Sequence, residues 1–300
     1  MTRELVFIHG RAQEHRDALA LKREWIAAWS AGLARSGLSL PLPEDRIRFP
    51  YYGDTLEQLT AGRPLGEAAR IVVRGQAMDS AQEVFMRGYL REVQERAGIS
   101  DDEVASTLDH AARTRGPLNW GWVQGILAAL DRNVPGASST SLALFTRDVY
   151  EYLTNASIRQ VMDAGVRGAF TPGRQSVVVS HSLGTVVAYN VLHAAGKGES
   201  KGSVDVPLFV TLGSPLAVTV VKQAIRPISH PSCAAHWFNA MDERDVVALY
   251  PLTPENFEVN PAIENKTDVD NPTENRHGVS GYLGDADVAR RVYEAVTTDV

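Results

Sequence analysis

Three residues whose side chains can together activate a hydroxyl group lie far apart in this 300-residue chain: Ser182, Asp245 and His277. A serine hydroxyl is scarcely ionised at neutral pH, so a nucleophilic serine requires a base, and the base requires a group that orients it. Imidazole and carboxylate side chains meet these two requirements. The chain therefore has the residue types needed to attack a carbonyl group, and the surrounding elements decide whether they can meet.

Ser182 lies at the junction of a predicted strand and a predicted helix. The β-branched residues 175–180 (QSVVVS) predict a buried parallel strand, and residues 183–189 (LGTVVAY) suit a helix. A sharp turn between them would project the serine hydroxyl from the sheet and direct the first N–H groups of the helix toward it. An ordinary strand-loop-helix connection is the alternative interpretation.

The pattern G-x-S-x-G marks such a turn, and this chain matches it incompletely. Ser180 stands at the first glycine position, whereas Gly184 keeps the second. Small residues are needed there because the strand and helix backbones approach closely. We expect the turn to tolerate Ser180, so Ser182 is the predicted nucleophile.

Acidic residues follow the predicted strand at 235–240 (AHWFNA), at the end of the strand where a site would form. Asp245 is the favoured acid, because Val246 and Val247 follow it and an orienting acid is usually partly buried. Asp242 is the alternative candidate. A solvated, charged turn with no chemical role is the third interpretation of this cluster.

His277 is the predicted base, in a loop that precedes the last predicted helix. His9 and His181 lie near the predicted site but beside backbone turns, and His236 lies within a strand. The remaining histidines have helical or loop positions without special context: His15, His110, His193 and His230.

Two backbone N–H groups are expected to bind the negative charge that develops on a carbonyl oxygen under attack. One belongs to Leu183, directly after the predicted nucleophile. The other comes from the turn after the first strand, where either Gly10 or Arg11 fits, because glycine lets the backbone come close. The Arg11 side chain is expected to face solvent, with an anionic substrate group as an alternative partner.

Strands and helices alternate at both ends of the chain, which predicts an α/β fold with a mostly parallel sheet sandwiched by helices. The predicted strands are residues 4–8, 46–52, 175–180, 207–212 and 235–240. The predicted helices of these parts are residues 15–35, 183–195, 216–225 and a closing helix from about 285.

Residues 55–170 contain no convincing strand and predict a large helical insertion, so residues 1–54 and 171–300 would form the core. A capping box begins a helix at Ser100 to Glu103, and Pro135 to Ser139 breaks the chain before a long amphipathic helix. The insertion could be a cap or lid above the serine, or a subdomain whose apolar stripes simply pack together.

Composition limits which binding partners and which cellular compartment we expect for the protein. The chain is 44% hydrophobic with net charge −6, and no basic run offers a footprint for nucleic acid. The single cysteine, Cys233, cannot form an intramolecular disulfide, and its expected role is that of a small apolar residue. The early first strand leaves no room for a signal peptide, and no apolar stretch approaches the roughly 18 residues of a membrane span. We expect a cytoplasmic protein.

Motifs for metals and nucleotide cofactors are not found in the sequence. The sequence lacks the phosphate-binding and dinucleotide-binding glycine patterns and the His-Glu-x-x-His zinc pattern. Residues 268–271 (DVDN) are similar to a calcium loop, but Thr273 stands where the glycine is required. We therefore expect neither a metal nor a cofactor.

Several motifs together resemble the α/β-hydrolase superfamily, in particular its lipase- and esterase-like bacterial members of undefined substrate. These motifs are residues 7–10 (FIHG), 179–185 (VSHSLGT), 211–216 (TLGSPL), 237–239 (WFN) with Asp245, and His277-Gly278 before Tyr282-Leu283. The order Ser, Asp, His along the chain is the order expected of this superfamily. The resemblance implies an α/β-hydrolase fold with a helical cap, a Ser182-Asp245-His277 triad, and hydrolysis of an ester, thioester or amide without a cofactor.

A serine hydrolase acting on a small molecule with an apolar acyl group is the function that the sequence predicts. Two alternatives stay open: a non-catalytic module that uses the same fold to bind a partner through its helical insertion, and an acyltransferase. The identity of the substrate and the oligomeric state do not follow from the sequence, because the pocket would be built by the unmatched middle segment.

Overall fold

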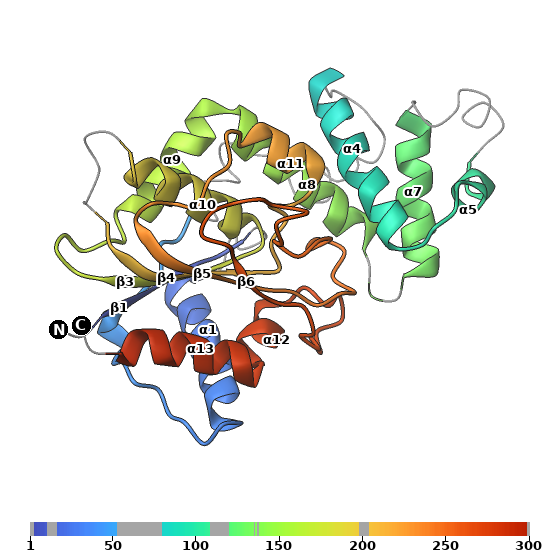
Figure 1. The fold of residues 1–300 in the computed structure, drawn as a ribbon. Helices are drawn as coiled ribbons and strands as arrows, with labels where there is room; N and C mark the ends of the chain where they lie inside the picture. The colour runs from blue at the N-terminus through green and yellow to red at the C-terminus, as the bar shows by residue number, and fades with distance from the viewer. Residues whose placement is uncertain are drawn as a thin grey trace.

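The computed structural model describes residues 3–10, 17–52, 80–108, 120–134, 136, 138–197 and 204–298. In this part of the chain a sheet with the strand order β2-β1-β3-β4-β5-β6 forms the centre, and every neighbouring pair is parallel (Figure 1). The strands are β1 (Glu4–Ile8), β2 (Ile47–Arg48), β3 (Ser176–His181), β4 (Val206–Leu212), β5 (Ala234–Ala240) and β6 (Glu264–Lys266). The predicted α/β class is confirmed.

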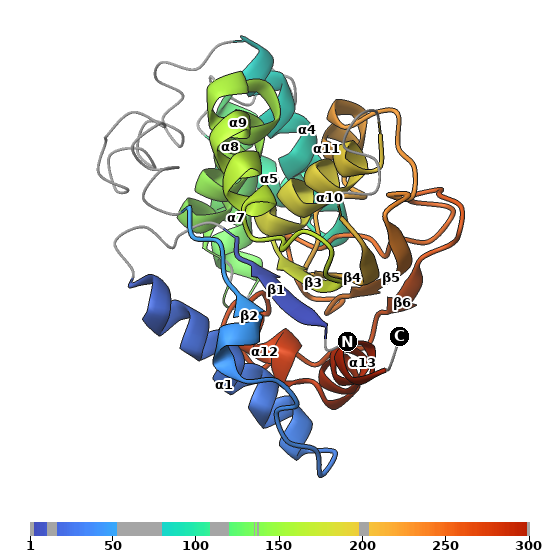
Figure 2. The same cartoon turned by 90° about the vertical axis from the view of Figure 1, so that its left-hand side faces the viewer.

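Helices cover both faces of the sheet (Figures 1 and 2). In Figure 1, α1 (Ala18–Ala34), α12 (Val279–Gly284) and α13 (Ala286–Thr297) lie below it. Above it lie α9 (Ala156–Arg167), α10 (Leu183–Ala195) and α11 (Thr219–Ala224). The two layers explain the unbroken apolar runs of the central strands, because residues on both faces are buried.

Alternate residues of the central strands point into two hydrophobic clusters. Val178 and Phe209 belong to the cluster on the α10 side, whereas Val177 and Val179 belong to the cluster on the α1 side. All four side chains are fully buried. This alternation fixes the register of each strand, because a shift by one residue would exchange its two faces.

The carboxyl ends of the central strands lie side by side, and we call this the carboxyl edge of the sheet. The terminal residues pair in register: Ile8 with Ser180, His181 with Leu212, and Leu212 with Ala240. Ser182 directly follows β3, and Asp245 lies in the loop that follows β5. The register therefore brings the segments that carry both residues to the same edge, where open α/β sheets form their sites.

Three elements differ from the sequence prediction. The strand predicted at 46–52 is paired only over Ile47–Arg48, since it lies at the sheet edge and Pro50 has no N–H to donate. Strand β6 was not predicted, because its sequence ENK is short and polar. Helix α12 was taken as part of a loop, and its six residues are too few for a clear helical period.

The described residues between 80 and 167 form helices and no strand, as predicted for them. They are α4 (Ser80–Arg96), α5 (Asp101–Ser106), α7 (Trp120–Asn133), α8 (Ser139–Thr154) and α9. The capping box is present: Ser100 N donates to Glu103 Oε2 at 2.7 Å, and Glu103 N donates to Ser100 Oγ at 3.2 Å. Figure 1 shows α4, α5 and α7 projecting beyond the sheet.

These helices share one hydrophobic cluster with the sheet. Tyr89 of α4 and Val149 of α8 belong to the same cluster as Val178 of β3, and α9 packs directly on α10. The division into residues 1–54, 55–170 and 171–300 stays a prediction, and residues 53–79 lie outside the described part.

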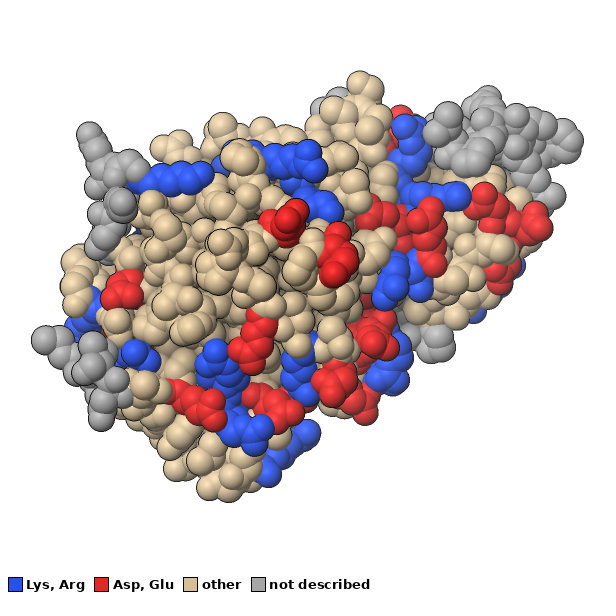
Figure 3. All heavy atoms as spheres, in the orientation of Figure 1, with Lys and Arg blue, Asp and Glu red and all other residues tan. Residues whose placement is uncertain are grey.

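The described surface mixes charges of both signs, with basic and acidic side chains interspersed on the face in Figure 3. Many of them pair, as Lys266 does with Asp268 at 2.8 Å and Arg244 with Asp270 at 2.6 Å. Among the described helices, none combines the length and apolar composition that crossing a membrane would need.

Candidate active site

Ser182 forms the whole turn between β3, which ends at His181, and α10, which begins at Leu183. Its backbone has φ 59° and ψ −132°, a conformation that a residue with a β-carbon rarely adopts. The Ser182 N–H donates to the Leu212 carbonyl at 3.0 Å, which ties the turn to the end of β4. Such strain persists only where the surroundings hold it, and it is common at functional sites.

Gly184 and Ser180, the small residues around this turn, are required or tolerated for different structural reasons. A β-carbon on Gly184 would lie 2.4 Å from the His9 oxygen and 2.5 Å from the Ile8 oxygen, so only glycine lets α10 pack on the end of β1. Ser180 is fully buried, and its Oγ donates to the Val210 carbonyl at 2.8 Å. The Ser180 hydroxyl is therefore satisfied, and the departure from glycine leaves the turn intact.

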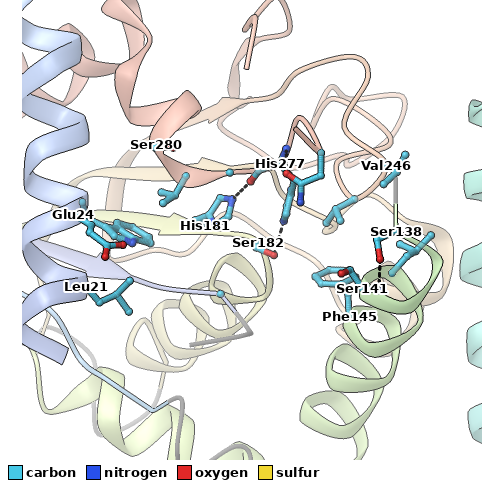
Figure 4. A pocket seen from close by; sticks show the side chains of 17 residues that line it. Leu21, Glu24, Ser138, Ser141, Phe145, His181, Ser182, Val246, His277 and Ser280 are labelled. Carbon is cyan, nitrogen blue, oxygen red and sulfur yellow. Dashed lines mark hydrogen bonds between the residues drawn. The ribbon is translucent and has the colours of Figure 1, made fainter. Parts of the chain in front are cut away.

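The three sequence-predicted side chains form one hydrogen-bonded chain. His277 Nε2 lies 2.8 Å from Ser182 Oγ (Figure 4). His277 Nδ1 lies 2.7 Å from Asp245 Oδ2. Because an ionised carboxylate can only accept, Nδ1 carries the ring proton of a neutral imidazole and Nε2 accepts from the serine hydroxyl. The arrangement can take a proton from Ser182 and return it.

The two candidate acids have different partners. Asp245 is 2% exposed, and its Oδ1 accepts from the Val247 N–H at 2.8 Å while its Oδ2 faces His277. Asp242 is 1% exposed, but its oxygens accept from the backbone N–H groups of Arg244 at 2.8 Å and Asn271 at 2.9 Å. Asp245 is therefore the acid in contact with the imidazole, whereas Asp242 connects the loop after β5 to the backbone of Asn271.

Two of the residues expected to supply backbone N–H groups, Leu183 and Gly10, lie beside Ser182. Leu183 is the first residue of α10, and in the described part of the chain its N–H makes no hydrogen bond. Gly10 lies against the serine: a β-carbon on it would be 2.8 Å from Ser182 Cβ and 3.2 Å from Ser182 Oγ. Arg11, the alternative second donor, lies outside the described residues.

His181 and His9 support the site as neutral rings. Burial, followed by the nearby His277, lowers the pKa of His181 to about 3. His181 Nε2 therefore donates to the His277 carbonyl, 2.7 Å away (Figure 4). Burial lowers the pKa of His9 to about 4, and its Nε2 accepts from the Tyr52 N–H at 3.2 Å. These contacts fix the loop of the base and the turn that contains Gly10.

A cavity of about 380 Å³ opens over Ser182 and His277 (Figure 4). Leu21 and Trp25 of α1 line one end, whereas Leu142 and Phe145 of α8 line the other. Polar groups also border it: the carboxylate of Glu24, and hydroxyl and amide groups from Ser138, Ser141, Asn275 and Ser280. The cavity thus combines apolar walls with polar groups and one carboxylate, a composition that suits a small molecule with both apolar and polar parts.

The described residues hold no grouping of His, Cys, Asp or Glu side chains suited to a metal ion. Asp268 and Asp270 belong to the segment that is similar to a calcium loop but lacks the required glycine. Asp268 pairs with Lys266, and Asp270 pairs with Arg244 and Arg276. Burial raises the pKa of the Cys233 thiol to about 11, so this residue remains a protonated, half-buried side chain.

Sequence reasoning missed three residues that shape the site. Tyr282 donates to Asp245 Oδ2 at 2.6 Å, and Gly213 leaves the space that His277 and Tyr282 fill. Phe145 was assigned only to a helical stripe, yet it borders the cavity and its ring centroid lies 6.2 Å from that of His277. Gly213 and Tyr282 belong to motifs that carry the family resemblance, but no local pattern marks their roles, because each role depends on contacts between distant segments.

Comparison of the chain with protein-family models and with curated proteins finds no match. The geometry of the site is therefore the basis for inferring what the protein does.

Proposed function

We propose that the protein is a serine hydrolase of the α/β-hydrolase superfamily that cleaves an ester, thioester or amide bond. The single observation that carries this proposal is the hydrogen-bonded chain from Ser182 Oγ through His277 to Asp245 Oδ2, with distances of 2.8 and 2.7 Å. Supporting observations are the strained strand-to-helix turn at Ser182 and the order Ser, Asp, His along the sequence.

The proposed reaction begins when Ser182 Oγ attacks the substrate carbonyl carbon while His277 Nε2 takes the hydroxyl proton. Asp245 holds the imidazole in the required tautomer and stabilises its charged form. The carbonyl oxygen becomes an oxyanion, which the N–H groups of Leu183 and of the Gly10 turn stabilise. His277 then gives the proton to the leaving group, and an acyl-serine remains.

Water completes the proposed cycle by the same groups in reverse roles. His277 takes a proton from a water molecule, and the resulting hydroxide attacks the acyl carbon. The new oxyanion collapses, the bond to Ser182 Oγ breaks, and His277 returns the proton to the serine. The products are a carboxylic acid and an alcohol, thiol or amine, and every proton is accounted for without a cofactor.

The proposed substrate is a small molecule with an apolar acyl group. The cavity of about 380 Å³ is close to the lower end of the roughly 300–1,000 Å³ typical of small-molecule sites. Apolar side chains of α1 and α8, such as Trp25 and Phe145, suit an acyl chain, and the Glu24 carboxylate of α1 disfavours an anionic substrate group. We further propose a cytoplasmic location, for which the lone Cys233 gives modest support.

The helical segment contributes to this proposal through α8. Four residues from the start of α8 and its N-cap border the cavity: Ser138, Ser141, Leu142 and Phe145. We propose that the segment is a cap that shapes the substrate site. A packing subdomain alone would have no reason to place polar and apolar side chains around the reactive serine.

A fluorophosphonate probe tests the proposal without knowledge of the substrate, because Ser182 Oγ would displace fluoride and form a covalent bond to phosphorus. The folded protein should be labelled stoichiometrically, and Ser182→Ala should abolish labelling. Ser176→Ala is the matched control, since Ser176 is buried at the start of β3, away from the cavity.

The same experiment separates the competing functions. Folded wild-type protein that resists labelling would refute the hydrolase and favour a binding module. If labelling succeeds, esters graded in chain length should be hydrolysed, with Ser182→Ala as the blank. Acyl products that form only with an added alcohol or thiol would instead identify an acyltransferase.

A further inference from the structure

The carboxylate of Asp245 accepts from four donors. Oδ1 accepts from the N–H groups of Val247 at 2.8 Å and Ala248 at 3.3 Å. Oδ2 accepts from two side chains, His277 at 2.7 Å and Tyr282 at 2.6 Å. The oxygen that faces the imidazole is therefore shared with a tyrosine hydroxyl, and this tyrosine is the only non-backbone group besides His277 among its described donors.

The hydroxyl group of Tyr282 stays protonated and therefore acts as a hydrogen-bond donor. The side chain is fully buried, and burial followed by the charge of Asp245 raises the pKa of Tyr282 well above its ordinary value. Its hydroxyl oxygen accepts from the Asp242 N–H at 3.2 Å, so the single hydroxyl proton is directed to Asp245 Oδ2. The hydroxyl therefore links the end of β5 to the acid in the following loop.

The helix that carries Tyr282 is fixed by the core. Helix α12 packs against α1, where a β-carbon on Gly32 would lie 2.3 Å from the Leu283 carbonyl oxygen. Gly278, the N-cap of α12, directly follows His277. The base and Tyr282 thus belong to one short, anchored segment, whereas Asp245 comes from a different loop.

Gly213 provides the space in which these side chains meet. It has φ +57°, and a β-carbon there would lie 3.0 Å from Tyr282 Cε2 and 3.1 Å from His277 Nδ1. Its N–H donates to the Ala240 carbonyl at 3.1 Å. The end of β4 therefore presses closely against both aromatic rings and leaves little room for them to rotate.

We infer that Tyr282 is a positioning residue that holds the Asp245 carboxylate in line with the His277 imidazole, an inference that rests on the proposed function. Without the hydroxyl, Oδ2 keeps only the imidazole as a donor and the carboxylate loses its link to the end of β5. The acid is then less well aligned when His277 becomes charged. Since hydrogen bonds to charged groups are among the stronger ones, the chemical step should slow about tenfold.

The test compares Tyr282→Phe with Tyr189→Phe, a matched control. Tyr189 is equally buried, and its hydroxyl donates to the Ser229 carbonyl at 3.2 Å, away from the cavity. Saturation kinetics with a fluorophosphonate separate probe affinity from the bond-forming rate at Ser182. We expect Tyr282→Phe to lower that rate about tenfold with affinity unchanged, and Tyr189→Phe to leave both unchanged.

A spectroscopic signature tests the contact independently of the reaction. The proton between His277 Nδ1 and Asp245 should give a proton resonance far downfield of the amides. Tyr282→Phe removes a competing donor from Oδ2, so the resonance should move further downfield. Site-specific 3-fluorotyrosine at position 282 is a stronger donor that keeps the ring and the fold, so it should move the resonance in the opposite direction.

The inference is overturned if both replacements leave the resonance unmoved, or if Tyr189→Phe slows labelling as much as Tyr282→Phe does. Wild-type protein that is folded but not labelled would instead refute the proposed function. In that event the two opposite shifts would still establish the contact, and their absence would still reject it. If Tyr282→Phe fails to fold, the fluorotyrosine protein decides.

Discussion

The carboxyl edge of the sheet and the α8 wall of the cavity are built on different principles. At the sheet edge, polar side chains occupy loops fixed by strand register, and each has a specific partner, as Ser182 has His277 and His277 has Asp245. The α8 wall places Leu142 and Phe145 beside the cavity through helix packing. Under the proposed function, this difference separates residues that perform chemistry from residues that select the substrate.

The two regions also differ in how far they tolerate change. Replacing a polar residue at the sheet edge leaves a buried partner without its hydrogen bond, which costs far more than the average contact. Replacing an apolar residue of the wall changes the volume and shape of the cavity. The first kind of change should abolish a step, and the second should alter a preference.

The largest expected effect after loss of Ser182 is that of Asp245→Asn. Loss of the charge and of the correct imidazole tautomer should lower kcat/KM on the order of 10³- to 10⁴-fold, and loss of its buried hydrogen bonds should lower stability by about 2 kcal/mol. Asp242→Asn is the control: it should lower stability by about 2 kcal/mol through its buried contacts and reduce activity much less. Ester hydrolysis and urea unfolding measure both, and a reversed pattern would assign the acid to Asp242.

Gly10→Ala should have the next largest effect. The added β-carbon would lie 2.8 Å from Ser182 Cβ, so the turn must shift away from the serine and displace its N–H groups. Loss of a well-placed oxyanion donor costs about 10²-fold in kcat, and we expect a loss of this order with KM little changed. Activity equal to wild type would remove the Gly10 turn from the proposed mechanism.

Phe145→Ala tests the wall itself and should change preference rather than chemistry. The enlarged cavity should favour longer acyl chains by roughly tenfold in relative kcat/KM, while labelling of Ser182 continues. Phe85→Ala in α4 is the matched control, because Phe85 is buried in the same cluster but does not line the cavity. An unchanged chain-length profile would show that α8 does not select the substrate.

The prediction with the smallest effect at neutral pH concerns the dependence of stability on pH, because this effect appears only on acidification. His9 and His181 have pKa values lowered to about 4 and about 3, so below the ordinary value of 6.5 the unfolded chain binds protons that the folded chain does not. The contribution of these two histidines to stability should be constant above pH 6.5 and fall toward pH 4 by about 1.4 kcal/mol per unit for each histidine. When stability is measured by urea unfolding, it should fall less steeply with decreasing pH in His181→Asn than in the wild type. The control His236→Gln, at an exposed position, should keep the wild-type dependence on pH.

The parts of the fold that were predictable are those with a strong local signal. The apolar runs of β1, β3 and β4 matched their strands, because residues buried on both faces leave a nearly unbroken pattern. Strand β5 also matched, through its buried second half at residues 237–240, although Ala235 and His236 are exposed. Strand β6 was missed because its polar residues pair at an edge, where neighbours rather than composition decide.

Prediction of the site from sequence was limited in the same way, because only residues with a local signal could be proposed. Ser182, Asp245 and His277 could be proposed together because a turn motif, an acid after a strand and a loop histidine each leave a local trace. The sequence favoured Asp245 over Asp242 only through the apolar residues that follow it, and it kept both as candidates, since both are buried and follow the same strand. Only their distances to other loops separate them, and those distances depend on how β5 and the loop after β6 pack.

The contact from His181 to the His277 carbonyl has a consequence for protein engineering. The side chain of His181, the residue before Ser182, donates to the backbone carbonyl of His277 at 2.7 Å. The two residues are 96 positions apart in the sequence. A graft that replaces either segment alone would leave an unmatched donor or acceptor in the interior. The two segments should therefore be exchanged as a pair when this scaffold is recombined with another.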